Sequence, residues 1–143
     1  MQMILALALV LPSFLFQQPP ASVTDAAAYA KIGAEKNPEA KKKLMLAFER
    51  NFPKSIRLPE VYIELSKTLV SQSDFATAEK YAEKAVSTVA RMKSESAASE
   101  IKDSGRQAWL NTLDTSVQKN LAWTKQMLAW QMQELRSNLT PKR

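Results

Sequence analysis

The spacing that comes closest to catalytic chemistry is a pair of carboxylates, Glu79 and Glu83, which lie one helical turn apart. Paired carboxylates can share general acid–base work. Each of these two is followed directly by a lysine, Lys80 and Lys84, and an ordinary surface ion pair accounts for that pattern. We therefore expect no catalysis from this pair.

Other reactive groups are scarce in the chain. It has no cysteine and no histidine, which excludes disulfides, thiolate metal sites, cysteine nucleophiles and histidine bases. The only glycines are Gly33 and Gly105, so a glycine-rich phosphate loop is absent. A nucleophile–base pair would have to come from groups such as serine and lysine. The sequence predicts a protein that is not an enzyme and holds no metal or cofactor.

The formal net charge is +6, which raises the question of nucleic-acid binding. Many lysines are interleaved with glutamates on predicted helices, and only residues 41–43 form a run. No aromatic residues are interleaved with basic ones, as a single-strand binding surface would require. A solvated helix face explains the charge, and nucleic acid is not an expected partner.

The N-terminus predicts export. Residues 3–16 are almost wholly apolar and uncharged, and a polar stretch follows at 17–22. The apolar run is too short for a membrane span of about 20 residues, and Pro12 interrupts it. We interpret residues 1–21 as a signal peptide and expect a periplasmic or secreted protein. The alternative is an uncleaved anchor at 3–16, which would be the chain's only contact with a membrane.

The remaining residues suffice for one domain and are rich in helix formers, so we expect an all-α fold. Residues 22–92 should form helix hairpins, 93–105 a linker and 106–143 a C-terminal helical segment. Whether 106–138 is one helix or two, with a break at the capping box of Thr115–Gln118, stays open. The other predicted helices begin at capping or proline signals and span about 25–36, 38–51, 59–70 and 75–92.

Residues 59–92 resemble one tetratricopeptide repeat (TPR), a helix pair in which large and small residues alternate at fixed positions. Tyr62 and Leu65 occupy large positions, Ser66 stands for the usual glycine, and Ala78 and Ala85 occupy small ones. Residues 24–55 resemble a degenerate preceding repeat. The junction Phe52-Pro53-Lys54-Ser55 is similar to those between repeats of bacterial envelope proteins. The resemblance implies antiparallel hairpins of TPR type, closed by a long C-terminal capping helix.

The last helix carries two apolar stripes at about 100° per residue. Trp123, Met127 and Trp130 form one, and the default interpretation is that they complete the core. The alternative is a partner or self-association surface, while a membrane-surface helix conflicts with Glu134 and the neighbouring glutamines. The other stripe comprises Val117, Leu121, Leu128, Met132, Leu135 and Leu139.

The function expected from the resemblance is that of an exported adaptor or scaffold, which binds a peptide or helix of another protein in a groove. The inner face of the first repeat helix would supply Glu60, Ile63, Lys67 and Val70. A single clear repeat is short for an independent groove. The alternative function is therefore a small helical-bundle protein that self-associates as a homo-oligomer through its C-terminal helix.

Overall fold

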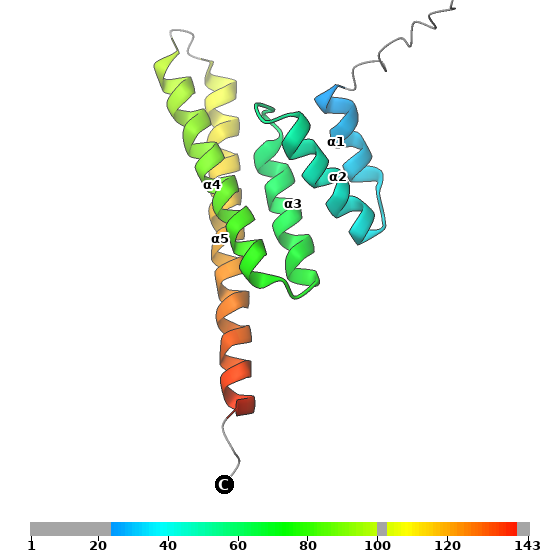
Figure 1. The fold of residues 1–143 in the computed structure, drawn as a ribbon. Coiled ribbons are helices and arrows are strands. Elements are labelled where there is room, and N and C mark those ends of the chain that lie inside the picture. The colour runs from blue at the N-terminus through cyan, green and yellow to red at the C-terminus, as the bar shows by residue number, and fades with distance from the viewer. Residues whose placement is uncertain (1–23, 100–102, 140–143) are drawn as a thin grey trace, which may run out of the picture.

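The fold is all-α, as predicted. A computed structural model describes residues 24–99 and 103–139, and the regular structure in these ranges consists of five helices without a strand (Figure 1). The predicted signal or anchor at 1–21 lies outside the described residues. The helices are α1 (Asp25–Ala34), α2 (Pro38–Asn51), α3 (Leu58–Ser71), α4 (Phe75–Ala98) and α5 (Ser104–Leu139).

The helices begin where the sequence places their caps. The Thr24 side chain accepts a hydrogen bond from a backbone N–H in the first turn of α1. Asn37 Oδ1 accepts two hydrogen bonds from backbone N–H groups in the first turn of α2, at 3.0 Å each. Asp74 Oδ1 caps α4 by accepting from the Thr77 N–H at 3.3 Å. Side-chain caps satisfy the N–H groups that have no partner in the first turn, so these three boundaries follow from local chemistry.

One boundary differs from the prediction, and the open question of one or two C-terminal helices is answered. α4 continues through residues 93–98, so most of the predicted linker at 93–105 is helical or belongs to the start of α5. α5 is one helix, and residues 115–118 lie inside it without interrupting it. The salt bridge from Lys93 of α4 to Asp114 of α5, at 2.8 Å, gives a physical reason for the longer α4. A contact between distant segments overrides the weak local signal there.

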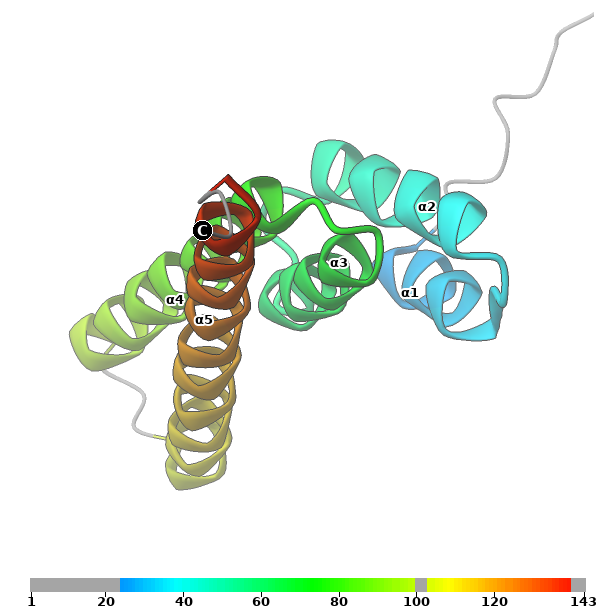
Figure 2. The ribbon, with the colours of Figure 1, turned by 90° about the horizontal axis from the view of Figure 1, so that it is seen from below.

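α3 occupies the middle of the arrangement. It packs extensively against α4, α4 packs against α5, and the α1–α2 pair lies on the other side of α3 (Figures 1 and 2). α5 also reaches back to touch α3. α4 can approach closely because the side chains that it buries include three alanines, Ala78, Ala82 and Ala85.

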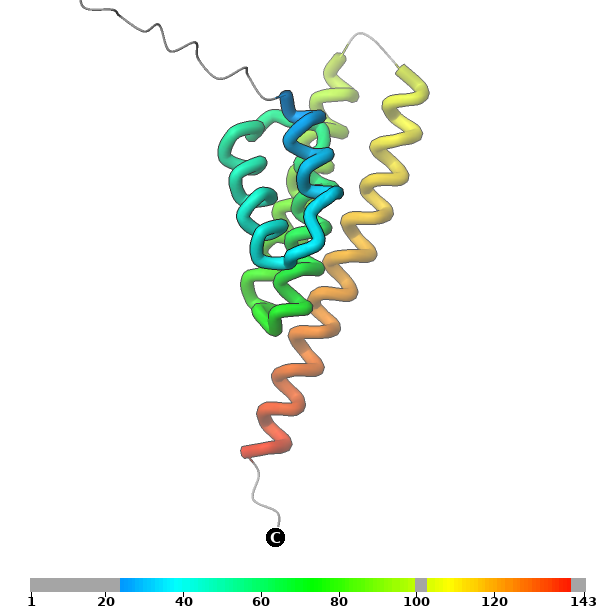
Figure 3. Tube along the Cα trace, turned by 90° about the vertical axis from the view of Figure 1, so that its right-hand side faces the viewer, coloured from blue at the N-terminus to red at the C-terminus, as the bar shows by residue number. Residues whose placement is uncertain are grey.

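α5 is longer than the helix it packs on. Its last turns project past the start of α4 (Figure 3). We call residues 129–139 the α5 overhang and residues 104–128 the packed segment. Every residue of the overhang is exposed except Gln131, which is half-buried. The large apolar side chains of the overhang, which are Trp130, Met132, Leu135 and Leu139, are therefore exposed to solvent.

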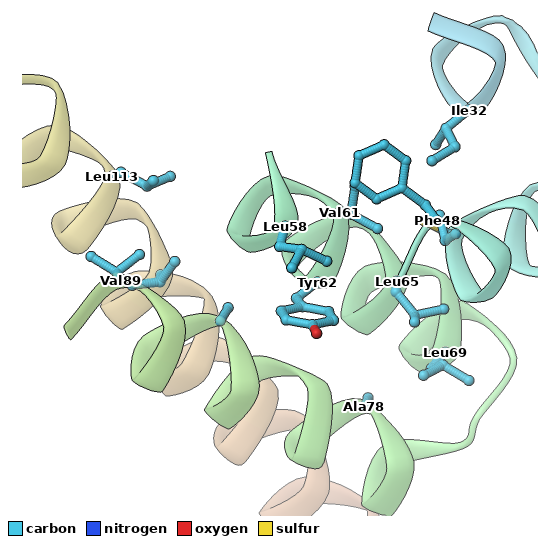
Figure 4. Close-up of a cluster of buried hydrophobic side chains, with 13 residues drawn as sticks. Ile32, Phe48, Leu58, Val61, Tyr62, Leu65, Leu69, Ala78, Val89 and Leu113 are labelled. Atoms are coloured by element: carbon cyan, nitrogen blue, oxygen red, sulfur yellow. The ribbon is translucent and has the colours of Figure 1, made fainter. Parts of the chain in front are cut away.

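The core joins side chains from all five helices (Figure 4). Phe48 of α2 and Leu65 of α3 are 1 % exposed. A polar network supports this core at one edge: Glu49 accepts hydrogen bonds from Tyr62 at 3.1 Å, from Tyr81 at 3.5 Å and from Lys84 at 2.7 Å. Burial and the nearby Glu49 carboxylate raise the pKa of Tyr62. One carboxylate thus ties α2 to the α3–α4 hairpin.

Candidate partner-binding groove

A groove of about 340 Å³ runs between α3 and α5. Ile63 and Lys67, one turn apart on α3, form one wall, and Trp123 belongs to the opposite wall. Three of the seven residues predicted to bind a partner are thereby brought together. The rest of the lining comes from α5: Ser116, Lys119 and Asn120.

Polar groups lie buried beside this groove, where α3 and α5 meet. Ser66 Oγ and Thr124 Oγ1 are 3.1 Å apart, and Asn120 Nδ2 donates to Ser66 Oγ at 3.3 Å. Thr124 also donates to the Asn120 carbonyl, at 2.8 Å. Asn120 is 6 % exposed, and its Oδ1 has no hydrogen-bond partner among the described residues. Leaving a buried polar atom unpaired costs about 1–3 kcal/mol, so this amide is poorly explained by stability alone.

The rim of the groove combines positive charge with apolar surface. Lys67 and Lys119 are exposed, and neither forms an ion pair within residues 24–99 and 103–139. Trp123 is 38 % exposed, so much of the indole faces solvent. The groove therefore offers two cations and an aromatic surface next to the Asn120 side chain.

The other predicted residues of α3 lie elsewhere. Glu60 lines a separate hollow among α1, α2 and α3, together with Tyr29 and Lys41. Burial and the adjacent Glu60 carboxylate raise the pKa of Tyr29. Val70 is half-buried and packs against the core. The structure thus places only Ile63 and Lys67, of the four, in the groove with α5.

The C-terminal stripes are arranged differently from the default interpretation. Trp123 and Trp130 are both exposed, Trp130 by 58 %, so the expectation that they complete the core is wrong. Met127 is half-buried. The buried face of α5 lies between the two predicted stripes and consists of Leu110, Leu113, Val117, Asn120 and Thr124. Only Val117 of the second predicted stripe is fully buried.

Sequence reasoning missed the residues that make this groove polar. Asn120 and Thr124 continue the spacing of 3 and 4 residues set by Leu110, Leu113 and Val117. An apolar pattern search passes over them because both are polar. The 3–4 spacing was the signal that could have found them, since it marks one seam of a packed helix.

The carboxylate pair is accounted for by an ion pair. Lys125 of α5 lies 3.8 Å from Glu79 and 3.7 Å from Glu83 of α4. The cation therefore comes from another helix and not from the adjacent lysines. Within the described ranges, no cluster of three or more acidic residues could hold a metal ion. None of the described helices has both the length and the apolar character to cross a membrane.

Comparison with known proteins gives no match: no protein-family model, no curated protein and no solved structure is significantly similar to this chain. The function therefore has to be argued from the groove itself.

Proposed function

We propose that this protein is an exported TPR-like adaptor, without catalytic activity, that binds a segment of another protein in the α3–α5 groove. One observation carries the proposal: Asn120, whose buried Oδ1 has no hydrogen-bond partner, lines a groove whose rim holds two unpaired lysines and an exposed tryptophan. Export depends on the interpretation of residues 1–21 as a signal, with an uncleaved anchor as the alternative.

The chemistry of the groove suggests the kind of segment. Asn120 lines the groove, so a ligand N–H or O–H group that reaches its buried Oδ1 would supply the missing hydrogen bond. A ligand that supplies the donor would recover the energy lost by the unpaired atom. Lys67 and Lys119 favour an acidic residue nearby, and Ile63 with Trp123 provides an apolar contact. An acidic peptide segment with at least one large apolar side chain meets all three demands.

The arrangement of the helices supports the adaptor interpretation. α3 and α4 are the two helices of the resembled repeat, and α5 follows as the next helix and packs on both. A helix added after a repeat buries the face that the repeat would otherwise expose. In this chain the same addition creates the second wall of the groove.

A random peptide library displayed on phage would test the proposal against the purified full chain. We expect enrichment of peptides that combine acidic residues with an aromatic or large aliphatic residue. The Lys67→Glu/Lys119→Glu variant should lose this enrichment at least tenfold, because the rim would repel acidic peptides.

A matched control carries the same charge change away from the groove. Lys43→Glu/Lys80→Glu replaces two exposed lysines on α2 and α4 and should retain the enriched peptides. Equal capture by both variants, or no enriched sequence class with the unmodified chain, would show that the groove does not bind peptides in this way.

A further inference from the structure

The side of α5 that lines the groove continues beyond the groove. Lys119, Trp123, Met127, Trp130 and Glu134 follow one another at spacings of 4, 4, 3 and 4 residues. At 100° per residue, this spacing keeps the five side chains within about 80° of one another around the helix. Lys119 and Trp123 belong to the lining of the groove, so the same side of α5 carries the other three residues past it. We call these five residues the groove-side stripe.

The groove-side stripe is longer than the wall that α3 provides. The hydroxyl oxygens of Ser66 on α3 and Thr124 on α5 are 3.1 Å apart, which aligns the two helices at this level. Both helices run in the same direction, and α3 ends at Ser71, whereas α5 continues to Leu139 (Figures 1 and 3). The part of the stripe from Trp130 onward therefore lies on α5 alone.

The stripe is apolar in its middle and charged at its two ends. Trp123 is 38 % exposed, Trp130 is 58 % exposed, and Met127 between them is half-buried. Lys119 and Glu134 are both exposed, and they lie about 22 Å apart along the helix axis. Tryptophan is enriched among the residues that dominate binding energy at protein interfaces. Two exposed tryptophans in line with the groove therefore indicate one continuous binding surface.

We infer that the segment bound in the groove is an amphipathic helix of about four turns, which follows the stripe from Lys119 to Glu134. The inference rests on the proposed function and specifies the partner of the same groove. The acidic end of this helix lies against Lys67 and Lys119, and its basic end lies against Glu134. Apolar side chains between the two ends cover Trp123 and Trp130.

The spacing of the stripe favours a helix over an extended peptide. Spacings of 3 and 4 residues form the seam along which two helices pack side by side. The two tryptophans are two turns apart, about 10 Å along the axis, and a partner helix repeats its own side chains at the same interval. Large apolar residues at positions i and i+7 of the partner therefore meet both indole rings.

A helix on the stripe does not compete with α4 for the same side of α5. Lys125, whose ion pairs with Glu79 and Glu83 place it beside α4, lies about 160° around the helix from Trp123. The partner helix therefore approaches from the side of α5 that lines the groove, away from α4.

A phage library of random peptides of about 20 residues, long enough for a four-turn helix, would test the inference with the purified full chain. Enriched peptides should carry acidic residues at one end, basic residues at the other, and large apolar residues seven positions apart. Trp130→Ser should weaken binding of a synthetic enriched peptide at least tenfold in fluorescence anisotropy, because the second indole contact is lost. The matched control is Leu135→Ser, since Leu135 is 50 % exposed on another side of the overhang. It should bind within twofold of the unmodified chain.

A charge exchange tests the basic end of the partner. Glu134→Lys should weaken binding of the same peptide several-fold, because the two basic groups repel each other. Affinity should return when the basic residues of the peptide are replaced by glutamate. A variant that stays equally weak with both peptides would contradict the contact between Glu134 and the basic end.

The outcomes distinguish this inference from the proposed function. If Lys67→Glu/Lys119→Glu abolishes binding but Trp130→Ser and Glu134→Lys bind as the unmodified chain does, the groove holds a shorter segment and the helix inference is wrong. If no class of peptide is enriched, the proposed function fails and the inference fails with it. Sedimentation velocity identifies the rival occupant: a chain that dimerises through Trp130, without an enriched peptide, would assign the stripe to a second copy and overturn the inference.

Discussion

The packed segment of α5 and the α5 overhang have a comparable share of apolar residues, ten of 25 and five of 11. Their burial nevertheless differs completely. The packed segment buries Leu110, Leu113 and Val117 against neighbouring helices, whereas the overhang exposes Trp130 and three aliphatic side chains. Apolar composition therefore predicts an interface on both segments, and only the length of α4 determines which of the two is filled within the chain.

The two segments also differ in what keeps them helical. Short isolated helices are marginal in water, and most helical stability comes from packing. The packed segment has that support from α3 and α4. The overhang depends on propagation from the packed segment and on good helix formers such as Gln131, Met132 and Leu135. A partner for the overhang would therefore stabilise helix and interface together.

The two segments should differ most in how much stability is lost when a leucine in each is replaced by alanine. Leu113→Ala should lower the free energy of unfolding by about 2–5 kcal/mol, because Leu113 is buried and its removal leaves a cavity. Leu135→Ala should change it by less than about 0.5 kcal/mol in the monomer. Urea denaturation followed by circular dichroism measures both. Similar losses for the two variants would mean that the overhang is packed within the monomer.

Alkaline pH should lower the stability of the packed helices without any contribution from the overhang. Burial and Glu49 raise the pKa of Tyr62 above its ordinary value of 10.0. A raised pKa contributes stability below about pH 10, and that contribution is lost as the pH rises further, because the unfolded state ionises first. We expect stability to decline above pH 10 and Tyr62→Phe to reduce the decline.

The overhang should be irrelevant to this alkaline response. A chain truncated after Leu128 keeps Tyr62, Tyr81 and Glu49 and should show the same decline in urea denaturation. A truncated chain whose stability no longer depends on pH in this range would assign the response to the C-terminal residues instead.

The starts of three helices could be predicted from the sequence, whereas the end of α4 could not. Caps at Thr24, Asn37 and Asp74 were readable because they act within three residues along the chain. The end of α4 could not be predicted in this way, because its last turns lie beside α5, and the salt bridge from Lys93 to Asp114 joins residues 21 positions apart. Local signals therefore located helix starts well, whereas the last turns of α4 include a contact to α5 that no local signal reveals.

The candidate groove was only half predictable for a related reason. Ile63, Lys67 and Trp123 could be selected from the repeat pattern and the aromatic spacing. Asn120 and Thr124 looked like ordinary solvent-facing residues, because nothing local shows that α3 would cover them. The same ambiguity affected the tryptophans, which the apolar pattern assigned to the core although the buried seam lies beside them.

A smaller change in the free energy of unfolding is expected when Asn120, a buried polar residue of the packed segment, is replaced. Asn120→Leu keeps a similar branched shape and removes the unpaired oxygen together with the long hydrogen bond from Nδ2 to Ser66, while Ser66 and Thr124 retain their contact. We expect the free energy of unfolding to rise by about 1 kcal/mol and peptide capture to fall. Thr124→Val should instead lower stability, because it takes a hydrogen-bond partner from Ser66. If Asn120→Leu lowered the free energy of unfolding as much as Thr124→Val does, the Asn120 amide would have only a structural role.

The smallest effect should come from the ion pair that joins the far ends of α4 and α5. Lys93 holds the pKa of Asp114 below its usual value, so the pair contributes above the ordinary carboxyl pKa of 3.8 and is lost as the pH falls through the lower folded value. Both side chains are partly exposed, and Asp114→Asn should lower stability at pH 7 by less than about 1 kcal/mol. Glu134→Gln, in the overhang, should have no effect on the monomer.

Amide hydrogen exchange would show which part of α4 depends on the ion pair with Asp114. Residues 93–98 were expected to be a linker, and their helix depends on contact with α5. Asp114→Asn should therefore increase exchange at 93–98 more than in the rest of α4, even where global stability hardly changes. Unchanged protection at 93–98 would mean that local propensity alone maintains the last turns of α4. The last turns of α4 would then be helical because of their own residues, independently of the contact with α5. The overhang would be the parallel case, because its helix also continues beyond the residues that α4 covers.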